Sequence, residues 1–180
     1  MSVKKEASGR RSIQVEVEVP GSTQSAVERR AAEAELRALI DKFAPAHLRL
    51  IAAMRRWLRN RLPTAHEVVY EYRDWFVISY SPNGHGYEGV LGIRASADGV
   101  KLFFNRCKEL PDPAKLLQGA GSQCRSIDVD SKSTFARPEV ARLIDEAIAR
   151  NPVPFASTGR GSVVMSPSTS AKQRRRPRPS

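Results

Sequence analysis

The chain has 180 residues, of which 41% are hydrophobic, and its formal net charge is +11. This length provides for one domain with a sizeable core. No apolar run reaches the roughly 18 residues that a membrane-spanning helix needs, so we expect no membrane partner. The N-terminal residues lack the apolar stretch of a secretory signal. Cys107 and Cys124 form no CxxC pattern, and we expect a cytoplasmic protein with reduced thiols.

The two ends of the chain differ in composition from its middle. Residues 151–180 contain six basic residues and no acidic one, and they are polar and rich in proline and serine. We expect residues 1–24 and 151–180 to be disordered. Alternating apolar residues within 12–19 are compatible with an edge strand, but no neighbouring segment is available to pair with it. Residues 25–150 are then the folded domain.

The folded domain should begin with two helices. Ser25 and Glu28 have the spacing of a capping box, and an apolar stripe follows at helical spacing. Pro45 suits the first turn of a second helix, which Pro63 ends. The second helix carries its apolar residues on one face. Its opposite face carries arginines, which we expect to be solvated: Arg49, Arg55, Arg56 and Arg59.

Four runs of β-branched and aromatic residues come next, at 66–73, 75–81, 89–96 and 99–106. Their short connections predict antiparallel hairpins. A fifth alternating run spans 122–130. In it Ile127 and Val129 share one face with Arg125, and that face is expected to be the buried one.

A short helix is expected between the fourth and fifth strands. Asp112 suits its N-cap, Ala114 to Gln118 provide one or two turns, and Gly119 is placed to end it. A last helix should begin near Pro138. The sum is an α+β fold: an antiparallel sheet of about five strands with two N-terminal helices, one short inserted helix and a C-terminal helix.

Three stretches resemble a known family. They are LFFNRCKELPDPAKLLQGAGSQCRSIDV, the following RPEVARLIDEAIA, and the strand-forming LPTAHEVVYEYRDWFVISYSP. They are similar to the YdhG-like family, also called domain of unknown function 1801, over about residues 45–150. The resemblance implies a small cytosolic α+β domain, usually bacterial, and supplies no catalytic residues.

The same resemblance raises an iron-chaperone role, since some family members have been discussed as frataxin-like intracellular iron chaperones. Such a role needs carboxylate ligands for a hard cation. In this chain the acids are scattered and the domain is net positive, so this role transfers poorly and is kept as an alternative.

Gly119, Gly121 and Arg125 have two interpretations. Backbone N–H groups of a glycine turn together with a fixed cation can hold a phosphate. The glycines follow a helix, however, whereas a dinucleotide cradle precedes one, and ordinary turn chemistry explains them more simply. Arg125 on a buried face needs a carboxylate, carbonyls or an anionic ligand, and a structural ion pair is the simpler answer. All three are kept as candidate ligand-binding residues. Lys115 is expected to be solvated.

Most aromatic residues of the strands are explained by core packing. Tyr70 and Tyr72 share one strand face, however, and are candidates to line a pocket with their hydroxyls as polar handles.

No metal site or cofactor is expected. His47, His66 and His85 lie in unlike settings, and together with the cysteines they match no known ligand spacing. No HExxH, GxSxG, Walker or kinase motif is present, so the sequence does not argue for an enzyme.

The basic tail is a candidate for weak, non-specific nucleic-acid binding, which Arg49, Arg55, Arg56 and Arg59 would extend. The arginines of the tail are Arg174, Arg175, Arg176 and Arg178. A solvating tail is the simpler interpretation. We therefore expect a non-enzymatic module that binds a small ligand or a protein. A metal chaperone and a nucleic-acid accessory protein are the alternatives.

Overall fold

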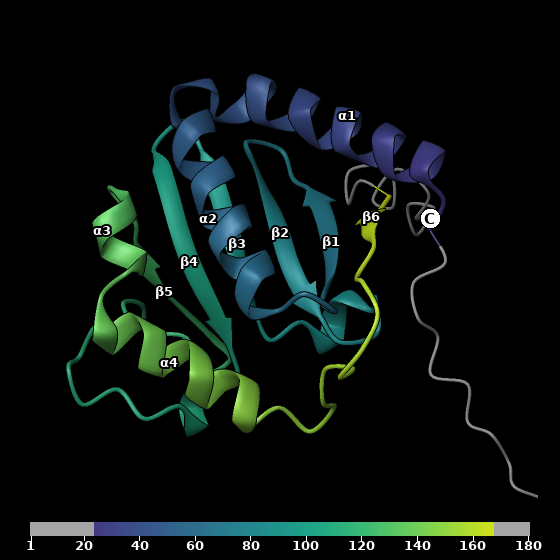
Figure 1. The fold of residues 1–180 in the computed structure, drawn as a ribbon. Helices are drawn as coiled ribbons and strands as arrows, with labels where there is room; N and C mark the ends of the chain where they lie inside the picture. Colours follow the sequence, from purple (N-terminus) through teal and green to yellow (C-terminus); the bar gives the residue numbers. More distant parts are fainter. Residues whose placement is uncertain (1–23, 168–180) are drawn as a thin grey trace, which may run out of the picture.

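A computed structural model describes residues 24–167 and contains one mixed six-stranded sheet beside a layer of helices (Figure 1). The strands are β1 (His66–Glu71), β2 (Trp75–Ser81), β3 (Leu91–Ser96), β4 (Gly99–Asn105), β5 (Cys124–Asp128) and β6 (Val163–Met165). Their order across the sheet is β5-β4-β3-β2-β1-β6. Strands β1 to β5 pair antiparallel through short connections, and β6 joins the free edge of β1 in parallel. The α+β fold expected from the sequence is confirmed.

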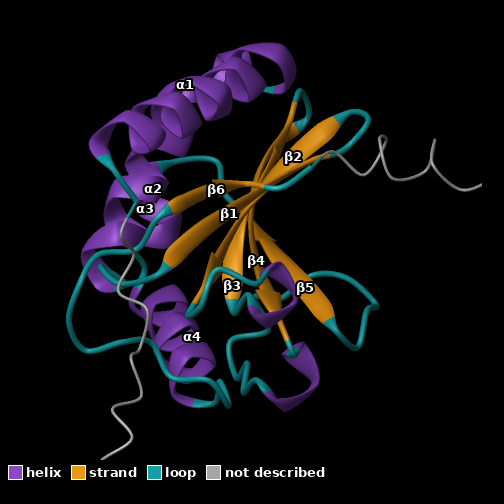
Figure 2. Ribbon diagram, turned by 90° about the vertical axis from the view of Figure 1, so that its right-hand side faces the viewer, coloured by secondary structure: helices purple, strands orange, loops and turns teal. Residues whose placement is uncertain are grey.

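The helices gather on one face of the sheet, as Figure 2 shows. They are α1 (Ala26–Phe43), α2 (Leu48–Arg61), α3 (Lys132–Phe135) and α4 (Pro138–Ala149). Three short 3-10 helices lie in the connections: η1 (Pro45–His47), η2 (Gly86–Glu88) and η3 (Cys107–Glu109). None of the helices within 24–167 has the length and apolar character that crossing a membrane requires.

Alternation along the strands separates a closed face from an open one. Phe76, Ile78 and Tyr80 of β2 are fully buried in the core beneath the helices. Val77 and Ser79 therefore lie on the other face, which none of the α-helices α1 to α4 covers. This alternation places one layer of apolar side chains between sheet and helices and leaves the open face available for a site.

The helix ends predicted from capping residues and prolines are found in the structure. The Ser25 side chain accepts a hydrogen bond from the backbone N–H of Glu28, and the Glu28 carboxylate accepts one from the N–H of Ser25. Helix α2 ends at Arg61, with Leu62 as its cap before Pro63. Helix α4 begins at Pro138 as predicted.

The short helix expected at 114–118 does not form. The Asp112 carboxylate does accept hydrogen bonds from the N–H groups of Leu116 and Leu117, at 2.9 and 2.8 Å. Lys115, however, has a φ of +52°, which a helix cannot continue through. Gln118 then pairs with Ser126 as an isolated β-bridge. The capping signal is therefore used for a turn that returns the chain to β5.

Residues 151–167 also differ from the disorder expected for 151–180, because they carry β6. Val163 is buried against α1 and β1. The amide side chain of Gln24 donates from Nε2 to the carbonyl of Val163 (2.7 Å) and accepts from its N–H (3.0 Å). A short apolar run in a polar segment acquires structure here because an unpaired strand edge is available to it. Residues 1–23 and 168–180, with the possible strand at 12–19, lie outside the described residues.

Candidate ligand-binding site

A cavity of about 520 Å³ opens on the open face of the sheet, opposite helices α1 to α4. Its floor is formed by residues of β1, β2, β3 and β4, including Tyr70, Val77 and Phe103. Its walls come from η2 on one side and from residues 118–126 on the other. The site therefore joins segments that are far apart in the sequence, and the order of strands in the sheet brings them together.

Four of the five candidate ligand-binding residues line this cavity: Tyr70, Tyr72, Gly119 and Arg125. Gly121 does not line it, although its carbonyl accepts a hydrogen bond from Nε of Arg125 at 3.0 Å. Gly119 has a φ of +109°, a backbone conformation that suits glycine. The two tyrosines share one face, as predicted, because they are two residues apart along the strand direction. Tyr70 lies in β1, and Tyr72 begins the turn to β2.

Stacked rings line one end of the cavity. Tyr72 stacks on Trp75 with ring centroids 3.9 Å apart and planes 7° apart. The guanidinium carbon of Arg94 lies 4.1 Å from the centroid of the same indole, a cation–π contact. The sequence analysis missed Trp75 and Arg94. The available signal was Arg94 itself, a single charge in the otherwise apolar strand GVLGIRAS, positioned opposite Val77 by the strand register.

Arg125 is not the buried, ion-paired residue that was expected. Arg125 of β5 lies opposite the buried Phe104 of β4, which faces the helices, but β5 is an edge strand and the Arg125 side chain is only half-buried. Although the register places Arg125 on that face, it belongs to the lining of the open-face cavity. Within residues 24–167 no carboxylate lies within 4.0 Å of Arg125 or of Arg94. Asp128 pairs with Lys101 instead. Two arginines that have no carboxylate partner within residues 24–167 thus line one cavity.

Ser79 is a third residue of the lining that the sequence did not reveal. Its side chain is 3% exposed, lines the cavity, and its Oγ has no hydrogen-bond partner in the described part of the chain. A buried hydroxyl without a partner costs about 1–3 kcal/mol. Nothing in the sequence marks it, because the lack of a partner depends on the loop that packs above it.

That loop approaches the sheet closely because it contains glycines. A Cβ on Gly86 would lie 1.2 Å from Oη of Tyr70, and a Cβ on Gly89 would lie 2.0 Å from Oγ of Ser79. Burial raises the pKa of the Tyr70 phenol, with a smaller contribution from Tyr72. Tyr70 therefore keeps its proton at neutral pH and can donate a hydrogen bond.

The chemistry of the lining is aromatic and cationic. Five rings line the cavity: Tyr70, Tyr72, Trp75, Tyr87 and Phe103. Arg94 and Arg125 supply positive charge, and none of the described residues in the lining is acidic. Such a lining can stack a flat ring and form charge-assisted hydrogen bonds to an anionic group.

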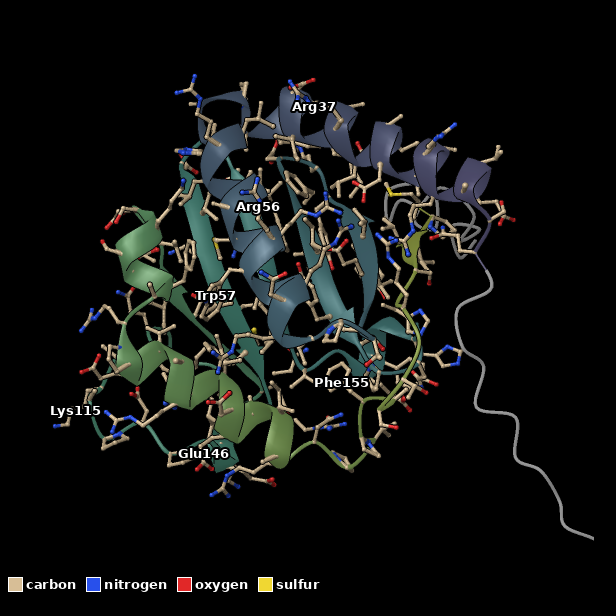
Figure 3. All side chains as sticks on the ribbon, viewed as in Figure 1. Arg37, Arg56, Trp57, Lys115, Glu146 and Phe155 are labelled. Carbon is tan, nitrogen blue, oxygen red and sulfur yellow. The ribbon has the colours of Figure 1, made fainter. Side chains whose placement is uncertain are left out.

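The remaining candidates lie elsewhere. Lys115 is exposed on a loop beyond the helices, as Figure 3 shows. His47 contacts the carbonyl of Ala97, His66 contacts Ser162, and His85 stacks on Tyr87. Both cysteines are free thiols, and burial raises the pKa of each. Among residues 24–167 no three or more His, Cys, Asp or Glu residues gather in a way that could hold a metal ion.

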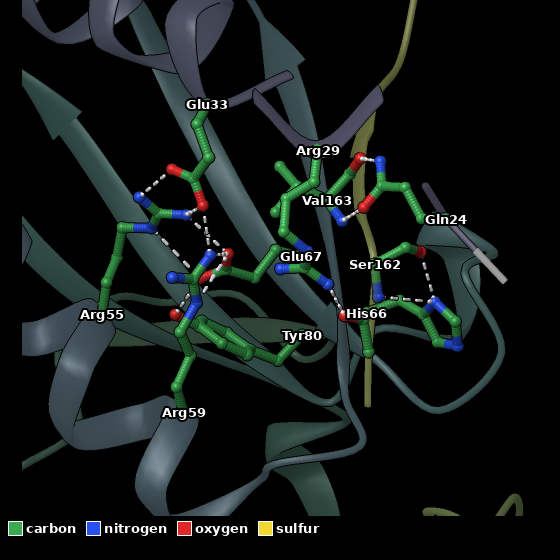
Figure 4. A network of polar contacts seen from close by, with 11 residues as sticks. Gln24, Arg29, Glu33, Arg55, Arg59, His66, Glu67, Tyr80, Ser162 and Val163 are labelled. Carbon is green, nitrogen blue, oxygen red and sulfur yellow. Dashed lines mark hydrogen bonds and ion pairs between the residues drawn. The ribbon is translucent and has the colours of Figure 1, made fainter. Parts of the chain in front are cut away.

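The expectation of a solvated arginine face on α2 is wrong for Arg55 and Arg59 (Figure 4). Both bind Glu67 of β1, which is 2% exposed, and Glu33 of α1. The α2 pattern could not reveal this, because both carboxylates come from other elements. Arg49 and Arg56 are exposed. The tail arginines Arg174, Arg175, Arg176 and Arg178 lie outside the described residues.

Comparisons with known proteins returned nothing at a significant level: no protein-family profile, no curated protein and no solved structure matches the chain.

Proposed function

We propose that the protein is a binding module whose ligand is a small, flat organic anion held on the open face of the sheet. The observation that carries this proposal is the cavity itself. It combines five aromatic rings with two arginines and the Oγ of Ser79, and within the described residues these arginines have no carboxylate partner and this Oγ has no hydrogen-bond partner. Its volume of about 520 Å³ lies in the range of small-molecule sites.

Each feature supports a different part of the ligand. The stacked Tyr72 and Trp75 offer an aromatic surface, and Arg94 and Arg125 offer donors for a carboxylate or sulfonate. Ser79 and the protonated Tyr70 offer hydroxyl donors within the same lining. A ligand that bridges the rings and the arginines would satisfy groups that have no partner within the described chain.

Membership of the YdhG-like family stays a proposal that rests on the stretches quoted above. The metal-chaperone alternative has no cluster of donor side chains within residues 24–167 in its favour. The nucleic-acid alternative depends on tail residues outside the described part of the chain.

The test uses 1-naphthoate as the anionic aromatic probe and 1-naphthylmethanol as its neutral counterpart, titrated calorimetrically into the full chain. We expect naphthoate to bind at least about tenfold more tightly, because charge-assisted hydrogen bonds to guanidinium contribute on the order of 1.5–3 kcal/mol. Arg125→Gln and Arg94→Gln should each remove most of this advantage and leave the affinity for the alcohol little changed.

Arg30→Gln is the matched control, since Arg30 is exposed on α1 and does not line the cavity. Equal affinity for the acid and the alcohol, or equal losses in the Arg125 and Arg30 variants, would overturn the proposal.

A further inference from the structure

A second cavity, of about 600 Å³, lies on the helical side of the sheet, at the edge where β6 joins β1. It is bounded by α1, α2, the start of β1 and the segment Gly159–Ser162. None of the described residues that line it is aromatic. Its lining contains one carboxylate, that of Glu67, and five arginines: Arg29, Arg55, Arg56, Arg59 and Arg160.

Two of these arginines are neutralised. Arg55 donates to Glu33 at 2.9 Å and to Glu67 at 2.6 Å, and Arg59 donates to Glu33 at 2.6 Å and to Glu67 at 2.5 Å. Figure 4 shows the two guanidiniums between the two carboxylates. This arginine–glutamate quartet has no net charge, and its Arg55, Arg59 and Glu67 form one wall of the cavity.

Three arginines remain without a carboxylate. Within residues 24–167 no acidic oxygen lies within 4.0 Å of Arg29, Arg56 or Arg160. The guanidinium of Arg29 donates to the carbonyl of Gly161, which fixes its position beside the cavity. Burial lowers the pKa of Arg29, and repulsion from Arg160 and Arg59 lowers it further. Positive charge is therefore crowded into this cavity and only partly compensated.

We propose that this cavity binds a compact oligophosphate of the pyrophosphate type, bridging α2 and the Gly159–Ser162 segment. Two linked phosphates carry roughly −3 near neutral pH, which matches the three uncompensated guanidiniums. The planar fork of a guanidinium suits phosphate oxygens. The absence of aromatic lining distinguishes this site from the open-face cavity, so the inference goes beyond the proposed function and does not depend on it.

The experiment titrates sodium pyrophosphate into the full chain by calorimetry at constant ionic strength. We expect one saturable site, and we expect Arg56→Gln and Arg160→Gln each to weaken binding at least about tenfold. Both side chains are exposed and make no ion pair with any residue of 24–167, so their loss should leave folding intact. Arg49→Gln is the control, because Arg49 is exposed on the same helix but does not line the cavity.

Two further full-length variants separate this site from other cations. Replacing Arg174, Arg175, Arg176 and Arg178 by Gln should leave pyrophosphate affinity unchanged, and so should Arg125→Gln. Loss of binding in the tail variant would overturn the proposal in favour of the tail. Equal affinities in the Arg49, Arg56 and Arg160 variants would overturn it as well. So would tight binding of a 20-nucleotide single-stranded DNA that pyrophosphate cannot displace.

Discussion

Ser79 and Ser81 are two buried serines on the open face of β2 that differ in one respect. Ser81 Oγ donates to the carbonyl of His85 at 2.8 Å, whereas Ser79 Oγ has no partner within residues 24–167. A buried hydroxyl without a partner costs free energy in the unliganded protein, and a ligand that reaches it would supply the missing hydrogen bond.

This contrast predicts opposite effects for the same substitution. Ser79→Ala should leave the unfolding free energy unchanged or raise it by up to about 1 kcal/mol, because an unsatisfied buried hydroxyl is removed. Ser81→Ala should lower it by about 1–3 kcal/mol, because a hydrogen bond is lost and the His85 carbonyl loses its donor. Urea unfolding measures both values. Naphthoate affinity should fall in the Ser79 variant, and a destabilised Ser79 variant with full affinity would contradict this assignment.

At the scale of elements, β6 depends on contacts at both ends of the chain. Its backbone pairs with β1. The side chain of Gln24 makes two hydrogen bonds to the backbone of Val163. The guanidinium of Arg29 in α1 donates to the carbonyl of Gly161, just before the strand. A three-residue strand has too few hydrogen bonds to be stable alone. We therefore expect β6 to depend on these contacts together with the close approach of residues 159–162 to the start of β1.

Gly161→Ala should detach β6, because the added Cβ would lie 1.7 Å from the carbonyl oxygen of Ala65 and backbone would have to move. Amide hydrogen exchange should then become faster at 163–166, including the N–H of Ser166 that donates to Val69. Exchange in β2, β3 and β4 should change little. Ser157→Ala, at an exposed position of the same segment, is the control. Unchanged exchange at 163–166 would show that this close approach does not hold the strand.

At the scale of the whole molecule, the sheet separates two cationic cavities of different chemistry. The open face carries rings and two arginines, and the helical side carries arginines arranged around the Glu33 and Glu67 carboxylates. The buried Glu67 carboxylate also accepts a hydrogen bond from Tyr80, at 2.8 Å. This network ties α1, α2, β1 and β2 together, so its charge state affects the stability of the whole domain.

The network predicts how stability depends on pH. Burial alone would raise the pKa of Glu33 and Glu67, but bonds to Arg55 and Arg59 outweigh it and lower both, that of Glu33 to about 2. Carboxylates with a lowered folded-state pKa stabilise the protein above their unfolded pKa of about 4.5, and this contribution is lost as the pH falls toward 2. The unfolding free energy should therefore decrease across this window.

Glu67→Gln tests the same network at neutral pH. It should lower the unfolding free energy by about 3–5 kcal/mol, because Arg55 would remain buried with one of its two counterions gone. It should also flatten the acid dependence. Asp41→Asn, in the exposed Arg37–Asp41 pair, should cost no more than about 0.5 kcal/mol. Similar losses in the two variants, measured by urea unfolding, would contradict a stabilising role for the network.

Local interactions determined those parts of the protein that the sequence predicts well. The capping box at Ser25, the five antiparallel strands and helix α4 follow from patterns within a few residues. So does the common face of Tyr70 and Tyr72, because side chains alternate along a strand whatever packs around it.

Tertiary packing decided the rest, because partners from distant segments are invisible in a local pattern. The α2 sequence predicts that Arg55 and Arg59 are solvated, but the fold brings Glu33 of α1 and Glu67 of β1 into contact with both. The sequence predicts a buried Arg125, but β5 is an edge strand and leaves this residue half-buried. The sequence predicts no structure at 163–165, but this segment pairs with the edge of β1. Ser79 has no sequence signal at all, since its lack of a partner is a property of the loop above it. Side-chain alternation and helix capping depend on a few neighbouring residues. The counterion of an arginine, the position of a strand in the sheet and the lack of a hydrogen-bond partner depend on the path of the whole chain.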